Sequence, residues 1–84
     1  MEIVFLSNAW EDYLFWRKTD EMMLKNINEL IKQCARSPFE GIGKPEALKA
    51  DLSGWWSRRI NQEHRLVYRV KNSRLLIAQC RKHY

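Results

Sequence analysis

Six residues in the second half of the chain have side chains suited to cleaving RNA. Attack of a ribose 2′-hydroxyl on the neighbouring phosphate needs a base for the hydroxyl, cations for the added negative charge and an acid for the leaving oxygen. Glu46, Arg65 and His83 are residues of these three types. Three others can assist, by charge or by stacking of an aromatic ring on an unpaired base: Lys49, Arg59 and Tyr84.

Most of these residues also have ordinary structural explanations. Glu46 and Lys49 are spaced as an i, i+3 ion pair on a helix. Arg59, with Arg58 beside it, has the charge that protects a strand edge from aggregation. His83, near the end of the sequence, can belong to a frayed tail. Composition and spacing alone therefore indicate a basic α/β module that binds nucleic acid.

The chain is short and has the composition of a folded globule. Its 84 residues allow one domain, residues 1–84, and 45% of them are hydrophobic and 30% charged. No apolar run approaches the roughly 20 residues needed to cross a bilayer, and the first residues do not resemble a secretory signal. We therefore expect a soluble cytoplasmic protein that does not associate with a membrane.

The charge of the chain is segregated between its two halves. Residues 1–43 hold five basic and seven acidic side chains, whereas residues 44–84 hold ten basic and three acidic ones. Six of those ten are arginines, whose planar fork suits phosphate groups. The second half thus favours a polyanionic partner.

The start of the chain predicts a strand followed by a helix. Residues 1–6 place β-forming apolar side chains on both sides, so we expect a strand that lies inside a sheet. Asn8 and Glu11 are spaced as a capping box, which predicts a helix from here to about Lys18. The residues that repeat in it at helical spacing are Trp10, Tyr13, Leu14 and Arg17.

The second predicted helix has a clearer pattern. Residues 19–21 supply an N-cap and acidic groups for a first turn, and Pro38 disfavours helical geometry before it, so the helix should end near Ser37. Cys34 and Cys80 lie among apolar neighbours and are expected to be buried thiols; neither has the spacing of a metal ligand. One apolar stripe runs along the helix: Met23, Ile27, Leu30, Ile31 and Cys34.

The second half of the chain predicts a loop and a strand meander. Two prolines and two glycines make residues 38–45 a surface loop, which leads into a single helical turn at residues 45–49. Strand-like runs follow at residues 55–60, 65–70 and 74–81. Their short connections predict an antiparallel meander.

The middle run alternates between an apolar and a basic side. Leu66, Tyr68 and Val70 face one way, and the opposite side carries Arg65 and Arg69. The predicted fold is therefore α+β in two layers, a small single domain in which an antiparallel sheet packs against two N-terminal helices and leaves a basic face exposed. Three further residues are expected to serve packing and structure: Trp55, Trp56 and His64.

Several spaced blocks of sequence carry a family resemblance. They are Pro38-Phe39-Glu40-Gly41, Gly43-Lys44-Pro45-Glu46, Leu48-Lys49, Leu52-Ser53-Gly54, Trp56-Ser57-Arg58-Arg59-Ile60, Glu63-His64-Arg65-Leu66-Val67-Tyr68 and His83-Tyr84. This series resembles the YoeB toxin family of the wider RelE/ParE superfamily, and the similarity spans nearly the whole chain.

The resemblance implies a RelE-like fold, similar to that of microbial ribonucleases, and a toxin that cuts messenger RNA in the ribosomal A site. By the same resemblance Glu46 is the general base, His83 the general acid and Arg65 the phosphate ligand. The implied partners are the ribosome, messenger RNA and an acidic antitoxin of the YefM kind, with a homodimer left open; no metal or other cofactor is expected. The implied auxiliary binding residues are Lys49, Arg59 and Tyr84.

A second class of function also fits the basic half of the chain. A protein without catalytic activity, resembling the ParE branch that poisons DNA gyrase or acting as a repressor subunit, would need the arginine cluster. Such a binder has no use for Glu46 and His83 placed around that cluster. The presence of both residues favours the enzyme.

Overall fold

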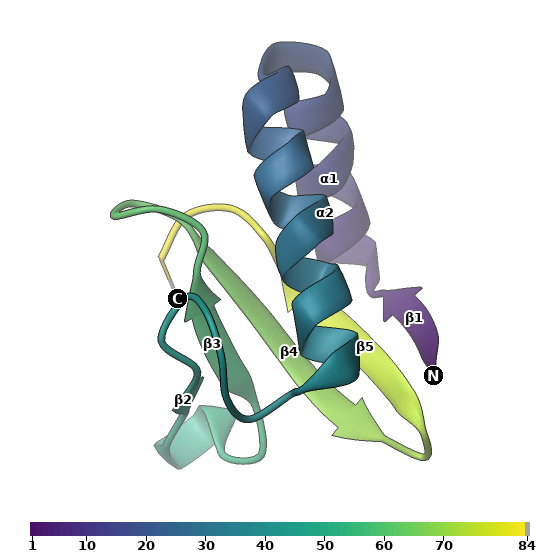
Figure 1. Ribbon diagram of the computed structural model, residues 1–84, viewed down its shortest axis with the longest axis vertical. Helices are drawn as coiled ribbons and strands as arrows, with labels where there is room; N and C mark the ends of the chain where they lie inside the picture. The colour runs from purple at the N-terminus through teal and green to yellow at the C-terminus, as the bar shows by residue number, and fades with distance from the viewer. Residues whose placement is uncertain (84) are drawn as a thin grey trace.

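Two helices lie against one face of a five-stranded sheet in the computed structural model of the chain, which describes residues 1–83 (Figure 1). The strand order across the sheet is β1-β5-β4-β3-β2. This arrangement confirms the predicted two-layer α+β fold. The elements in chain order are β1 (Glu2–Phe5), α1 (Ser7–Thr19), α2 (Glu21–Arg36), β2 (Glu46–Ala47), a 3₁₀ turn (Ala50–Leu52), β3 (Trp56–Arg59), β4 (Arg65–Lys71) and β5 (Arg74–Gln79).

The first strand occupies an edge of the sheet, so its predicted interior position is wrong. Strands β3, β4 and β5 form the expected antiparallel meander, but β1 pairs only with β5 and runs parallel to it, with Glu2 opposite Arg74. Ile3 is consequently 44% exposed. Alternating apolar residues look the same in the sequence of an edge strand and of an interior strand, so the pattern could not distinguish the two positions.

Helix α2 follows its prediction closely. The Asp20 carboxylate accepts a hydrogen bond from Met23 N at 3.0 Å and caps the first turn, and the helix ends at Arg36. Its stripe packs on the sheet and forms much of the core. The residues of α2 that are buried are Ile27, Leu30, Ile31 and Cys34.

Helix α1 differs from its prediction in its start and in its buried face. It begins at Ser7 with Leu6 at the cap position and no side-chain cap, so the capping box of Asn8 is not formed. The buried residues are Ala9 and Trp16, whereas Trp10 is 46% exposed and stacks on Tyr13 with ring centroids 5.8 Å apart. The helical spacing of Trp10 and Tyr13 therefore reflects aromatic stacking near the surface and does not mark the buried face of the helix.

The core lies between the helices and β4 and β5. The buried side chains of the two strands include Leu66, Tyr68, Leu75 and Ile77. Both cysteines are fully buried, as expected, and burial raises the pKa of Cys34 to about 11 and that of Cys80 to about 12. No helix within residues 1–83 is long and apolar enough to cross a membrane.

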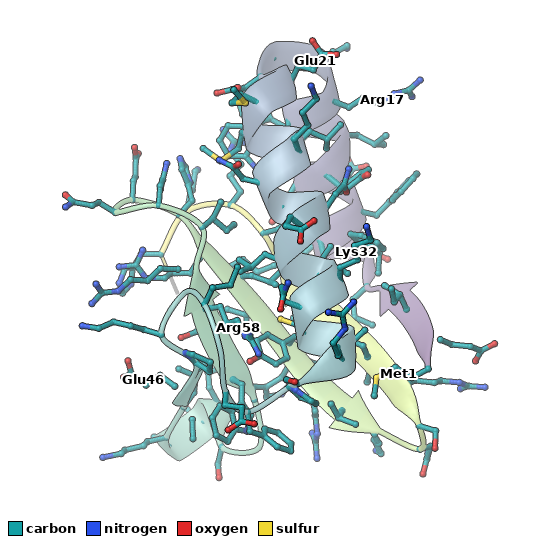
Figure 2. All side chains as sticks on the ribbon, viewed as in Figure 1. Met1, Arg17, Glu21, Lys32, Glu46 and Arg58 are labelled. Carbon is teal, nitrogen blue, oxygen red and sulfur yellow. The ribbon has the colours of Figure 1, made fainter. Side chains whose placement is uncertain are left out.

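Arg58 is a core residue rather than a guard of a strand edge. Its side chain is fully buried, and its guanidinium donates to the carbonyl oxygens of Ser37, Glu40 and Ile42. It also donates from Nε to the hydroxyl of Tyr68 at 3.1 Å. Figure 2 shows Arg58 lying between the sheet and the loop that follows α2. Arg58 therefore holds that loop against the sheet.

The same loop adds a short strand where a helical turn was predicted. Gly43 O accepts a hydrogen bond from Arg59 N at 2.6 Å, and Glu46 then pairs with Ser57 across β2 and β3. Gly43 has a φ of +82°, and a Cβ atom there would lie 2.9 Å from Arg59 O. A glycine is thus required for the loop to approach β3 closely enough to pair. The predicted helical turn at residues 45–49 is wrong.

Candidate active site

Sheet register places Glu46 on the face that points away from the helices. Side chains of directly paired residues in neighbouring strands project from the same face of a sheet, so Glu46 shares a face with Ser57 and, through it, with Val67. Leu66 and Tyr68 alternate with Val67 along β4 and lie in the core. Figure 2 shows Glu46 at the β2 end of the sheet, away from the helices. We call this surface the outer face.

Arg59 and Arg65 lie on the same outer face, directly opposite each other across β3 and β4. Each is two residues from the pair of Ser57 and Val67, which keeps it on that face. Glu46 and Arg59 are diagonal neighbours, which are separated by about 7–8 Å, and Arg65 lies two strands and two residues from Glu46, roughly 12 Å by the same spacings. Glu46 and the two arginines therefore fit around one internucleotide phosphate and its ribose.

Arg65 is held firmly by the loop that precedes it. Its Nη1 donates to the carbonyl oxygens of Asn61, Gln62 and His64 at 2.8, 3.1 and 3.2 Å. These three bonds engage one nitrogen of the guanidinium and fix the plane of the group. A half-buried, oriented guanidinium of this kind suits a phosphate ligand.

The segment that carries His83 is anchored, which argues against a frayed tail. After β5 the chain turns back across the end of β4 toward β3 (Figure 1), and Arg65 N donates to Lys82 O at 3.0 Å. His83, an exposed residue, therefore follows directly on a residue bonded to the start of β4. His83 therefore begins close to the backbone of Arg65, at the start of β4. Tyr84 lies outside the described residues.

Lys49 lies just beyond β2 at the same edge of the sheet, exposed and ahead of the 3₁₀ turn. Because Glu46 is in a strand, the two residues do not form a helical ion pair. The ordinary structural explanation for this pair therefore fails. Lys49 remains available to add positive charge near Glu46.

The outer face thus carries a carboxylate and two guanidinium groups, and an imidazole belongs to the residue that follows the Lys82 carbonyl bonded to Arg65 N. They can supply a proton acceptor, charge stabilisation and a proton donor, which are the three functions required for attack by a 2′-hydroxyl. Among residues 1–83 there is no group of three or more His, Cys, Asp or Glu side chains placed to hold a metal ion.

Sequence patterns did not reveal two residues that support this site. The sequence predicts Arg58 and Arg59 to be surface charges, but alternation along β3 places Arg58 on the opposite face from Arg59. His64 was expected to be structural, and it is 8% exposed, with its ring against that of Trp16. His64 also accepts a hydrogen bond from the backbone N–H of Lys82, the residue before His83. No local sequence pattern predicts that bond.

Comparison with known proteins finds similar sequences and similar structures over the whole chain. The family model of the YoeB-like toxin of bacterial type II toxin-antitoxin systems matches residues 5–84. Toxin YoeB of Escherichia coli (strain K12) is 58% identical over 84 residues, which cover 100% of both chains. A solved YoeB/ParE toxin from Agrobacterium tumefaciens superposes with a TM-score of 0.97 at 53% identity and covers 100% of both chains.

Two solved structures from Staphylococcus aureus are also similar, and both contain assemblies. One is a heterotetrameric YoeB-YefM toxin-antitoxin complex, with a TM-score of 0.91 and 50% identity. The other is a YoeB dimer, with a TM-score of 0.92 and 50% identity. Each similarity covers 100% of this chain and 98% of the other.

Proposed function

The chain belongs to the YoeB-like toxin family of bacterial type II toxin-antitoxin systems, and from that premise we propose that it is a ribosome-dependent endoribonuclease that cuts messenger RNA in the ribosomal A site. The observation that supports the proposal is the backbone arrangement around Glu46, Arg65 and His83. The first two share the outer face by sheet register, and the backbone of Lys82 ties the third to Arg65.

The proposed reaction uses the substrate's own hydroxyl as the nucleophile. Glu46 accepts the proton of the 2′-hydroxyl as its oxygen attacks the adjacent phosphorus. Arg65 and Arg59 bind the phosphate oxygens on which negative charge accumulates. The bond from phosphorus to the 5′-oxygen breaks, and His83 donates a proton to that leaving oxygen. The products are a 2′,3′-cyclic phosphate and a free 5′-hydroxyl.

Dependence on the ribosome follows from the shape of the site. On the outer face, Glu46 and Arg59 are exposed and flank the buried side chains of Ser57 and Val67, so this surface does not itself align a flexible messenger for in-line attack. Alignment of reacting groups supplies roughly 7–11 kcal/mol of a barrier. A codon already ordered in the A site would therefore be cut far faster than free RNA.

The decisive experiment is a toeprint on ribosomes paused with a defined codon in the A site. The wild-type protein should produce a new cut within that codon, and Glu46→Gln and His83→Gln should each slow cutting by roughly 100-fold to 10,000-fold. Glu29→Gln, a matched change on the exposed side of α2, should cut like the wild type. Mass spectrometry of the fragments reads the expected ends directly.

Three results would contradict this function. They are equal rates on free and ribosome-bound messenger, a 5′-phosphate on the downstream fragment, and undiminished cutting when the hydroxyl at the cut site is replaced by hydrogen. The last two would show that water or a protein group attacks the phosphate. Inhibition of DNA gyrase with no messenger cut would instead identify a toxin without nuclease activity.

The proposed cellular partner is an acidic antitoxin of the YefM kind, which folds on the basic outer face. The half of the chain from residue 44 onward supplies ten basic side chains, and the S. aureus relative forms a complex with YefM. Binding should weaken as salt rises, because exposed charges are screened beyond about 8 Å at physiological ionic strength. Capture from source cells of ribosomes without any small acidic protein would contradict this partner.

A homodimer is also proposed, because the S. aureus relative forms a dimer. Analytical ultracentrifugation of the free protein tests for it.

A further inference from the structure

Three elements hold the short segment between β5 and His83. From α1, Trp16 Nε1 donates to Cys80 O at 2.8 Å and the Asp12 carboxylate accepts from Cys80 N at 3.1 Å. From the start of β4, Arg65 N donates to Lys82 O at 3.0 Å, and from the end of β5 the side-chain amide of Gln79 donates to the same oxygen at 3.1 Å. The segment is therefore fixed at its first residue and again at its last, one position before His83.

The remaining backbone group of Lys82 is bound by a buried side chain. Lys82 N donates to Nδ1 of His64 at 2.7 Å. Because Nδ1 accepts a hydrogen bond, the ring is the neutral tautomer that carries its hydrogen on Nε2, which lies 3.7 Å from the Glu63 carboxylate. Both backbone polar groups of Lys82 are thus bonded, the amide to His64 and the carbonyl oxygen to Arg65 and Gln79.

His64 is itself rigidly placed. Its ring packs edge-on against the indole of Trp16, with ring centroids 4.8 Å apart, and only 8% of the residue is exposed. Its backbone N–H donates to the side-chain oxygen of Asn61 at 2.7 Å. A side chain held on both sides in this way offers Nδ1 at a defined position.

The conformation of Lys82 requires such support. Its φ of +67° lies in the left-handed region, which residues other than glycine occupy only where their surroundings hold them. The direction in which the chain leaves Lys82 sets where His83 begins. Without the bond at Lys82 N, this conformation and the direction of His83 would depend on the two bonds at the Lys82 carbonyl oxygen.

We propose that His64 is a positioning residue for the cleavage described above, because its Nδ1 atom holds the Lys82 amide and so aims His83 at the leaving oxygen beside Arg65. The inference rests on the proposed function for its effect on activity. His64 does not serve as a second proton donor to RNA, since its ring is buried against Trp16 and its Nδ1 is occupied by Lys82.

Two substitutions separate this role from simple packing. His64→Asn places a side-chain oxygen where Nδ1 lies relative to Cγ, and so keeps the acceptor while losing the ring. His64→Phe keeps an aromatic ring against Trp16 and loses the acceptor. Lys82→Ala is the control for the exposed side chain next to His83, because it retains the backbone amide.

The first measurement is hydrogen exchange of the Lys82 amide, observed by NMR in the whole protein. We expect a slow exchange rate in the wild type and in His64→Asn and fast exchange in His64→Phe, together with an imidazole ¹⁵N spectrum of the wild type that shows an unprotonated Nδ1. Equal protection of the amide in His64→Phe and the wild type would overturn the proposal.

The second measurement is the rate of A-site cleavage. A displacement of a reacting group by about 1 Å can cost roughly 100-fold in rate, so kcat of His64→Phe should fall by about that factor while KM is unchanged. His64→Asn should keep kcat near the wild-type value even where its thermal stability is lower, and Lys82→Ala should cut normally. A kcat that follows thermal stability rather than the presence of the acceptor would show that His64 only packs.

The two proposals fail in different ways. If His83→Gln cuts as fast as the wild type, the proposed function is wrong. The exchange rates of the Lys82 amide then still test whether His64 holds that amide. If His83→Gln is inactive but His64→Phe has the wild-type kcat, the function stands and the positioning role of His64 is wrong. If His64→Phe does not fold, the rates of His64→Asn and of His64→Gln, whose amide lies one atom further out, decide between the two roles.

Discussion

Arg59 and Arg65 are direct cross-strand partners in β3 and β4, so two positive side chains stand opposite each other on one face of the sheet. Like charges in this position destabilise a sheet by about 0.2–1 kcal/mol. An anion bound between them would relieve the repulsion. The free protein therefore carries at this pair an electrostatic cost that a phosphate ligand would remove.

The first prediction follows from that cost. Arg59→Thr, which places a neutral β-forming residue in the strand, should stabilise the free protein by about 0.5 kcal/mol and raise its melting temperature by a few degrees. The same variant should cut the A-site codon more slowly because one phosphate contact is lost. Calorimetry and toeprinting measure the two effects. Arg59→Lys keeps the charge and should not be stabilised.

A second prediction concerns the buried guanidinium of Arg58. Arg58→Met removes the donors that serve Ser37 O, Glu40 O and Ile42 O, and should lower the free energy of unfolding by about 3 kcal/mol or more. Urea denaturation measures the loss. Arg74→Met removes an exposed arginine that is paired with Glu2 at 2.9 Å, and it should cost less than about 1 kcal/mol. Equal losses of unfolding free energy in the two variants would contradict the role of Arg58 in holding the loop after α2 against the sheet.

A third prediction tests the loop that positions Glu46. Gly43→Ala should be strongly destabilising and should slow cleavage, because the added methyl group meets the backbone oxygen of Arg59 at 2.9 Å and forces β2 away from β3. Gly54→Ala is the matched control, since Gly54 also has a positive φ of +95° but would meet only the Arg69 side chain, at 3.4 Å. Loss of cleavage should be confined to the Gly43 variant when both are assayed well below their melting temperatures.

A fourth prediction concerns alkaline pH. Burial raises the pKa of Cys34 to about 11 and those of Cys80 and Tyr68 to about 12, from values of 9.0 for the thiols and 10.0 for the phenol. Above pH 9.0 the unfolded chain loses thiol protons that the folded chain keeps, so stability should fall as pH rises. The loss should be on the order of 1 kcal/mol for each thiol by about pH 10.

Urea denaturation at several pH values from neutral to alkaline measures this slope. Cys34→Ala and Cys80→Ala should each make the slope shallower, although both variants should be less stable at neutral pH because they remove buried side chains. An unchanged slope in both variants would show that the thiols are not responsible for it.

Long periodic elements could be predicted from the sequence, and contacts between distant residues could not. The stripe of α2 and the alternation of β4 reflect which side of each element is buried, so the local pattern reports them directly. Strand β2 contains only Glu46 and Ala47, and it exists because Arg58 and Gly43 bring the preceding loop to β3. A strand of two residues shows no alternation of apolar and polar side chains, and the proline and glycine residues nearby favour a turn.

The candidate site was found by residue type and family resemblance rather than by pattern. Nothing local in the sequence indicated that Arg65 N would bond to Lys82 O, or that His64 would accept from Lys82 N. Those bonds depend on the return of the chain after β5, which only the assembled sheet specifies. His83 could therefore be nominated as an acid from the sequence, but its placement could not be predicted.

The parallel pairing of β1 with β5 has a consequence for the biosynthesis of this toxin. Glu2 and Arg74, which are joined by an ion pair at this junction, lie 72 positions apart, so the first strand to be translated waits for almost the last. At about 5–20 residues per second, that delay lasts several seconds. The five-stranded sheet cannot be completed until β5 has left the exit tunnel. For the nuclease proposed above, a nascent chain therefore lacks the assembled site, and the interval gives an antitoxin time to bind the chain before that site forms.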